Sequence, residues 1–239
     1  MHKKLIKKEP TKVDFKELHN LCFISKKEIY NSTYQEKGKT KHLLDKFSSR
    51  LGEIDEMPFI GYVGTNYSNH STQIVFVSRA EIDSTNEDDE LYANLYESFM
   101  QFKNSASNLE SAYRQYADSY KEHILNSSCS SYLNHFFKET DLTIDDVAFV
   151  NAVPFKCLDN PSKKLYKPSI KDFTSRFFNI VQADWIQPFG LNDIQRISFE
   201  SNYVPYQINS GLSITNNAVS LKNLCPKSMN HLLWSYKKY

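Results

Sequence analysis

Residues 147–154, VAFVNAVP, give the clearest indication of how this chain folds. Six of the first seven residues are apolar, and a proline closes the run. A short run of this kind, rich in β-branched and aromatic residues, predicts a strand. Residues 74–77 (IVFV) have the same character, and residues 184–189 form a third run that ends at a glycine. Residues 218–224, where apolar and polar side chains alternate, predict a fourth strand.

Apolar residues at helical spacing separate these strands. Leu91, Leu95 and Phe99 recur on one face of a long segment. Ser169 follows Pro168 and can cap a later helix. The expected helical segments are residues 11–50, 91–125, 132–137, 169–181 and 229–239.

Strands that alternate with helices are typical of a parallel sheet covered on both faces. We therefore expect an α/β fold of three layers, with about four mostly parallel strands at the centre. In this prediction residues 1–239 form a single domain. A helical region at residues 1–54 precedes the sheet, and residues 91–137 form a helical insertion.

Composition narrows the class of protein. The 239 residues are 40% hydrophobic and 24% charged, which excludes a collagen-like or low-complexity chain. No apolar run approaches the roughly 18 residues that span a membrane, and the basic N-terminus lacks the apolar core of a secretory signal. The four cysteines are well separated and form no CxxC pair. We expect a soluble, cytoplasmic protein with reduced cysteines.

Charge is distributed unevenly along the chain although the formal net charge is only +1. Residues 1–50 carry 13 Lys and Arg against 6 Asp and Glu, and residues 151–239 carry 11 against 5. Residues 51–150 carry 5 against 17. Basic ends around an acidic middle hint at a polyanionic partner. The alternative is that lysine-rich and glutamate-rich solvated surfaces segregate by chance.

Ligands of an open parallel sheet bind beyond the carboxyl ends of its strands. The residues that follow the predicted strands are therefore the candidates for chemistry. They are Ser78, Arg79, Glu81 and Asp83 after the first strand, Asn151, Phe155 and Lys156 in and after the second, and Lys227 and Ser228 after the fourth.

These strand ends carry a resemblance to the uracil-DNA glycosylase superfamily that covers residues 55–239. Two positions depart from the family pattern: Ser78 stands where the first motif has glycine, and Cys225 where the last motif has histidine. The segments that are similar in order to the family's motifs are IVFVSRAE (residues 74–81), VAFVNAVPFKC (147–157), WIQPFG (185–190) and LKNLCPKSMN (221–230).

The resemblance implies roles for individual residues. Breaking an N-glycosidic bond makes the sugar oxocarbenium-like, so a carboxylate near C1′ is needed, and Glu81 and Asp83 are the nearest candidates. The amide of Asn151 offers a donor and an acceptor that match the edge of a pyrimidine. Phe155, Tyr62 or Tyr67 would stack on the flipped base. The alternatives are an acidic surface for the carboxylates and core packing for the aromatic rings.

DNA contacts are expected from cationic and hydroxyl side chains near the same strand ends. A run of lysines is also typical of an ordinary solvated loop. The expected DNA-binding residues are Arg79, Lys156, Lys163, Lys164, Lys227 and Ser228.

The sequence thus predicts a monomeric DNA glycosylase that flips out a modified or deaminated pyrimidine and hydrolyses its glycosidic bond, in repair or in defence against phage DNA with modified bases. We expect no metal, no other cofactor, and no iron–sulfur cluster, since a cluster needs four thiolates. One alternative is a nucleic-acid-binding protein that kept the scaffold and lost catalysis. Another is an unrelated α/β enzyme acting on a nucleotide or phosphate ester, although the chain has no GxGxxG, P-loop or HExxH motif.

Overall fold

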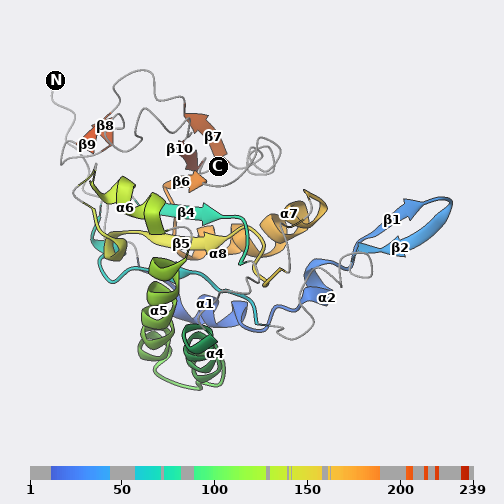
Figure 1. Cartoon of the computed structure of the whole chain (residues 1–239), viewed down its shortest axis with the longest axis horizontal. Helices are drawn as coiled ribbons and strands as arrows, with labels where there is room; N and C mark the ends of the chain where they lie inside the picture. Colours follow the sequence, from blue (N-terminus) through green and yellow to red (C-terminus); the bar gives the residue numbers. More distant parts are fainter. Residues whose placement is uncertain are drawn as a thin grey trace.

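The computed structural model has a mixed α/β fold built around one six-stranded sheet (Figure 1). It describes residues 12–43, 57–70, 73–81, 89–127, 130–138, 140, 142–157, 161, 163–188, 203–206, 213–214, 219–220 and 233–236. Among these residues, no helix is both long enough and apolar enough to cross a bilayer.

The central sheet has the strand order β3-β5-β4-β6-β10-β7. Strand β4 pairs in parallel with both β5 and β6, whereas β3, β10 and β7 join antiparallel. The register sets Ser78 beside Asn151 at the carboxyl ends of β4 and β5. The strands are β3 Tyr62–Val63, β4 Ile74–Ser78, β5 Ala148–Asn151, β6 Trp185–Pro188, β7 Tyr203–Tyr206 and β10 Leu233–Tyr236.

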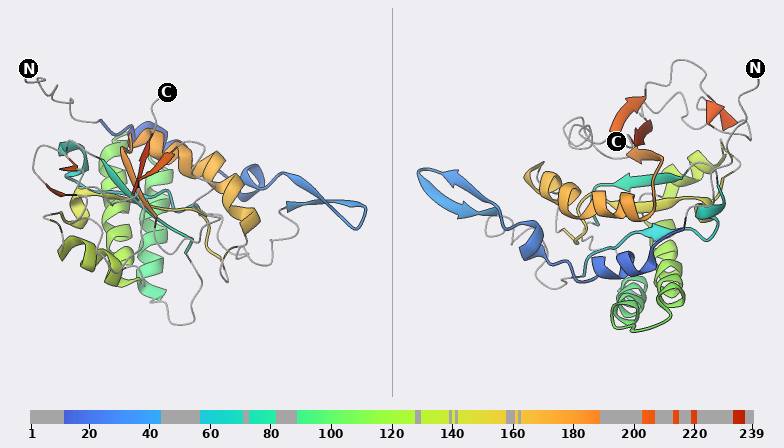
Figure 2. Two further views of the ribbon diagram at one scale, coloured as in Figure 1. Left: turned by 90° about the horizontal axis from the view of Figure 1, so that it is seen from above. Right: turned by 180° about the vertical axis from the view of Figure 1, so that it is seen from behind.

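Helices lie on both sides of the parallel strands (Figure 2). On one side the Phe76 ring of β4 packs edge-on against Phe136 of α6, with ring centroids 4.8 Å apart, and Phe149 of β5 meets Tyr120 of α5. The other side carries α7 and α8. The helices are α1 Phe15–Leu21, α2 Lys26–Ile29, α4 Asp89–Lys103, α5 Leu109–Asn126, α6 Ser130–Lys138, α7 Lys163–Ser169 and α8 Ser175–Ile180.

The three strand predictions at residues 74–77, 147–153 and 184–189 are confirmed as the parallel strands β4, β5 and β6. The fourth predicted strand is not confirmed as a member of this sheet. Of residues 218–224, Val219–Ser220 forms β9, but β9 pairs with β8 (Ser213–Ile214) in a separate antiparallel ladder.

Two segments expected to be helical contain strands. In the C-terminal segment, Leu233–Tyr236 is strand β10, in line with the strand preference of its two aromatic residues. Within residues 11–50, Thr33–Glu36 (β1) and Lys39–His42 (β2) form an antiparallel hairpin. Lys37 and Gly38 turn this hairpin with φ values of 50° and 73°, which a helix does not accommodate.

Two helix boundaries also differ from expectation. The helix expected to begin at Ser169 begins at Lys163 instead and contains Pro168. Ser169 caps nothing: its hydroxyl donates to the carbonyl of Leu165 at 2.7 Å, and a π-helical turn over Ile170–Thr174 leads on to α8. The helix expected over residues 91–125 is divided into α4 and α5, because Asn108 adopts a left-handed conformation with a φ of 53°.

The described core includes two buried cysteines, Cys22 and Cys157. Burial raises the pKa of the Cys22 thiol to about 12, so the thiol stays protonated at neutral and mildly alkaline pH. The thiolate, not the thiol, is the nucleophile.

We therefore expect iodoacetamide at pH 8 to leave Cys22 unmodified in the folded protein and to alkylate it after denaturation in urea. Peptide mass spectrometry of both samples, taken over a time course, measures the difference. Alkylation of Cys22 at the same rate in both samples would contradict this expectation.

Candidate active site at the carboxyl ends of the parallel strands

The loops that leave β4 and β5 run side by side beyond the sheet. Their backbones continue the strand pairing: the N–H groups of Ala152 and Val153 donate to the carbonyls of Ser78 and Arg79 at 2.9 and 2.8 Å. Further on, the N–H of Cys157 donates to the carbonyl of Glu81 at 2.8 Å. Residues 79–81 and 152–157 are thereby held together, as expected for neighbouring ends of parallel strands.

Asn151 lies at this end with its side chain 1% exposed. Its Oδ1 accepts a hydrogen bond from the hydroxyl of Ser78, and its Nδ2 donates to the hydroxyl of Tyr120 at 3.4 Å. Behind it, the hydroxyl of Thr174 donates to the carbonyl of Ala152 at 3.2 Å. The amide is therefore fixed in orientation by partners from β4 and α5.

Glu81 faces a histidine that no sequence motif indicated. Its Oε1 lies 3.0 Å from Nε2 of His123, and the two side chains are 17% and 9% exposed. A carboxylate beside an imidazole, both largely removed from water, is an arrangement that acid–base and electrostatic catalysis uses.

Helix α5 links the two halves of this site. Tyr120, the partner of Asn151, and His123, the neighbour of Glu81, are three residues apart on α5 and so share one face of the helix. Their ring centroids are 6.2 Å apart. Together with Ser78, Glu81 and Asn151 they form a group that we call the strand-end cluster.

Aromatic rings pack against this cluster. The ring of Phe59 stacks on His123 with centroids 6.1 Å apart and also meets Tyr120 at 5.8 Å. The ammonium of Lys156 sits 4.1 Å from the centroid of the Tyr92 ring, a cation–π contact. The surroundings of the cluster are thus largely aromatic, and Lys156 is the cation among them.

Other predicted site residues lie at this end in different environments. Arg79 is partly exposed. Burial raises the pKa of the nearby Tyr166 phenol, and the positive charge of Arg79 opposes that rise. Phe155 is fully buried and packs against Tyr30. Lys164 is exposed on α7.

The structure does not bring Tyr67 to this end, which corrects the expectation that it stacks on a base. Strand β3 runs antiparallel to β5, so the chain leaving β3 emerges at the amino end of β5. There the N–H of Asn66 donates to the carbonyl of Asp145 at 2.8 Å, and Tyr67 is buried. The predicted residues Asp83, Lys227 and Ser228, and the side chain of Lys163, lie outside the described part of the chain.

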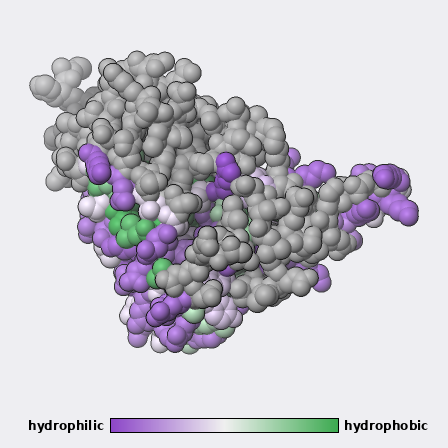
Figure 3. Space-filling view, in the orientation of Figure 1, coloured by the Kyte–Doolittle hydropathy of each residue, from purple (hydrophilic) through white to green (hydrophobic). Residues whose placement is uncertain are grey.

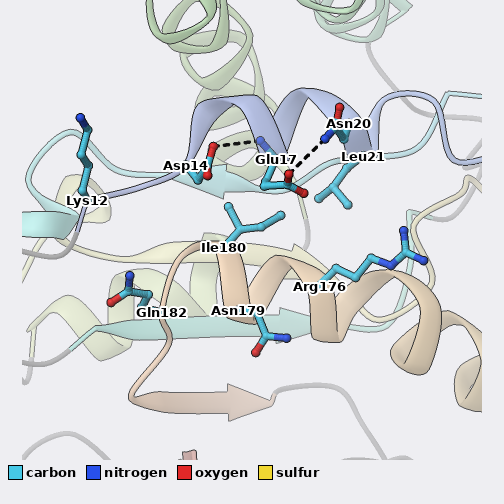
Figure 4. A pocket seen from close by; sticks show the side chains of 9 residues that line it. All are labelled: Lys12, Asp14, Glu17, Asn20, Leu21, Arg176, Asn179, Ile180 and Gln182. Carbon is cyan, nitrogen blue, oxygen red and sulfur yellow. Dashed lines mark hydrogen bonds between the residues drawn. The ribbon is translucent and has the colours of Figure 1, made fainter.

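A cavity of about 450 Å³ opens elsewhere, between α1 and α8 (Figure 4). Asp14, which caps α1, and Glu17 line one side of it, and Arg176, Asn179 and Ile180 of α8 line the other. None of the strand-end cluster lines it. The cavity therefore belongs to a different part of the molecule from Glu81 and Asn151.

In comparisons with known proteins, no protein-family model, curated protein or solved structure matches the chain.

Proposed function

We propose that this protein is a DNA glycosylase, of the kind that the uracil-DNA glycosylase superfamily represents, and that it excises a modified or deaminated pyrimidine. The observation that carries the proposal is the Glu81–His123 pair, 3.0 Å apart, in one cluster with the buried amide of Asn151. In support, both Glu81 and Asn151 follow or end parallel strands, where α/β proteins bind their ligands.

Glu81 supplies the anion that the reaction needs. As the bond between C1′ and the base nitrogen breaks, its electron pair leaves with the base and positive charge develops on the sugar. The Glu81 carboxylate stabilises that charge and orients a water, whose oxygen bonds to C1′ while its proton passes to the Glu81–His123 pair. Nε2 of His123 lies 3.0 Å from the carboxylate, so the imidazole is within reach of that proton.

Asn151 recognises the base in this proposal. Its donor and acceptor now engage Tyr120 and Ser78, and a flipped pyrimidine would take over those hydrogen bonds along its edge. The cation–π pair of Lys156 and Tyr92 lies beside the site, where a phosphate of the flipped nucleotide would pass.

The direct test is excision from DNAs that carry uracil, hydroxymethylated or glucosylated pyrimidines, read as alkali-labile sites. We expect the wild-type chain to cleave at least one of them and Glu81→Gln to be slower by about 100-fold or more, because it loses the anion but keeps the shape. DNA binding by Glu81→Gln should stay close to that of the wild type. The matched control is Glu122→Gln, an exposed position on α5 beside His123, which should retain full activity.

A second function is favoured by one observation. The Asn151 amide is buried and bonded at both its oxygen and its nitrogen, as in a side chain that serves the scaffold. A nucleic-acid-binding protein without catalysis would have this feature. If the wild type binds DNA but leaves every modified base in place, this second function replaces the first.

A further inference from the structure

The β1–β2 hairpin, residues 33–42, projects from the body of the molecule as an arm (Figures 1 and 2). Every side chain that is described in it is exposed. The two-residue turn at Lys37 and Gly38, with positive φ at both, gives the tight reversal that suits the twist of a two-stranded ribbon. At the base of the arm, the N–H of Leu43 donates to the carbonyl of Ser32 at 2.8 Å.

The described residues of the arm are hydrophilic (Figure 3). Lys37, Lys39 and Lys41 are exposed, and Glu36 is the single acidic residue among residues 33–42. Alternation along β2 sends Lys39 and Lys41 to one face and Thr40 to the other. On that second face, Nε2 of Gln35 donates to the hydroxyl of Thr40 at 2.8 Å.

The described side chains of the arm are all exposed, so they bury no apolar surface against the described body of the molecule. An isolated two-stranded hairpin is only marginally stable in water, so a projecting one gains stability from a partner. Because its described side chains are cationic or neutral and polar, that partner is anionic.

The arm emerges near the end of the sheet that bears the strand-end cluster. Just before it, the hydroxyl of Tyr30 shares a 2.8 Å hydrogen bond with that of Ser169 in α7. The same Tyr30 ring and the ammonium of Lys26 contact Phe155, in the loop that follows Asn151. The segment that carries the arm is therefore joined to the loop beyond β5.

We propose that the arm inserts into a groove of duplex DNA and holds it against the strand-end cluster, an inference that rests on the proposed function for the choice of partner. A two-stranded ribbon fits the major groove of B-DNA, and proteins use such ribbons there. The lysines on one face and at the tip contact phosphates, and the Gln35–Thr40 face meets the base edges.

The test is the affinity of the full chain for a short fluorescent duplex, measured by anisotropy between about 50 and 200 mM salt. We expect the combined variant Lys37→Gln, Lys39→Gln and Lys41→Gln to raise Kd about tenfold or more. The slope of log K against log salt should flatten by about 1 for each phosphate that a lysine no longer neutralises. The substitutions replace exposed side chains, and circular dichroism checks that the fold is kept.

The matched control removes the same charge elsewhere, at the exposed Lys12, Lys16 and Lys138, and should change Kd much less. Equal loss of affinity in both variants would overturn the proposal, as would an unchanged Kd in the arm variant or an equal loss on single-stranded DNA. The proposed function fails separately. A wild type that binds through the arm but excises nothing overturns the glycosylase and leaves the arm, whereas an active chain unaffected by the arm substitutions overturns the arm alone.

Discussion

Above pH 10 the protein is expected to unfold cooperatively, because buried tyrosines must stay neutral in the folded state. Burial raises the pKa of five phenols above the ordinary value, so they keep their protons in the fold and lose them in the unfolded chain. The five are Tyr30, Tyr62, Tyr113, Tyr116 and Tyr166.

The size of the effect follows from proton linkage. The unfolded state binds fewer protons than the folded state once pH exceeds about 10, so the free energy of unfolding falls as pH rises. Each tyrosine removes about 1.4 kcal/mol per pH unit, and five remove roughly 7 kcal/mol per unit. Because a whole domain is stable by about 5–15 kcal/mol, one to two pH units above 10 suffice to unfold it.

The measurement compares tyrosinate absorbance at 295 nm with far-ultraviolet circular dichroism across pH 9–12. The largest rise in absorbance should coincide with the loss of helix signal. Tyr166→Phe is the matched variant, since the Tyr166 hydroxyl has no hydrogen-bond partner among the described residues and the substitution keeps the ring. It should move the midpoint of unfolding to higher pH. Full ionisation of all tyrosines with the helix signal intact would contradict the prediction.

The central strands could be predicted because their side chains are buried on both faces. Residues 74–77 and 147–153 are nearly continuous apolar runs, and such runs leave few alternatives to a central strand. The antiparallel additions could not be predicted in the same way. Strand β10 begins at the second leucine of the pair Leu232-Leu233, and its pairing with β6 joins residues about 50 positions apart in the chain.

The hairpin illustrates a signal that is present in the sequence but weak. Lys37-Gly38 is a two-residue turn between threonine-containing segments, which is typical of a hairpin. Apolar residues at helical spacing on either side favour a helix over the whole region: Leu18 and Leu21 before the hairpin, and Leu43 and Phe47 after it. Local turn chemistry decided the structure there, because no apolar face needed to be covered.

Of the candidate site, only the residues that end or follow the strands of the sheet could be predicted from the sequence. Asn151 ends β5 and Glu81 follows neighbouring β4 by three residues, so the order of the elements implies that both lie at the same edge of the sheet. Tyr120 and His123 could not be placed, since their position depends on how α5 docks on the sheet. Their spacing of three residues puts them on one helix face, but nothing local indicates that this face meets the strand ends.

Gly64→Ala is expected to destabilise the protein severely, because a methyl group at this position has no space. A Cβ on Gly64 would overlap the backbone Cα, C and O atoms of Asp145. The two segments cannot separate easily, since the N–H of Gly64 donates to the carbonyl of Val147 at 3.0 Å and the N–H of Asn66 donates to that of Asp145 at 2.8 Å. Backbone atoms pinned on both sides of the clash cannot move as a flexible side chain does.

The expected loss is about 4 kcal/mol in the free energy of unfolding, at the upper end for overpacking, and about 10 °C in Tm. Urea titration and thermal melting followed by circular dichroism measure both. The matched control is Gly38→Ala in the arm, where a Cβ meets nothing within 4 Å and only the left-handed φ of 73° opposes the substitution. That variant should lose about 1 kcal/mol or less from the stability of the body, because the arm packs against none of the described core. Equal stability of the Gly64→Ala variant and the wild type would show that the turn after β3 does not lie against Asp145.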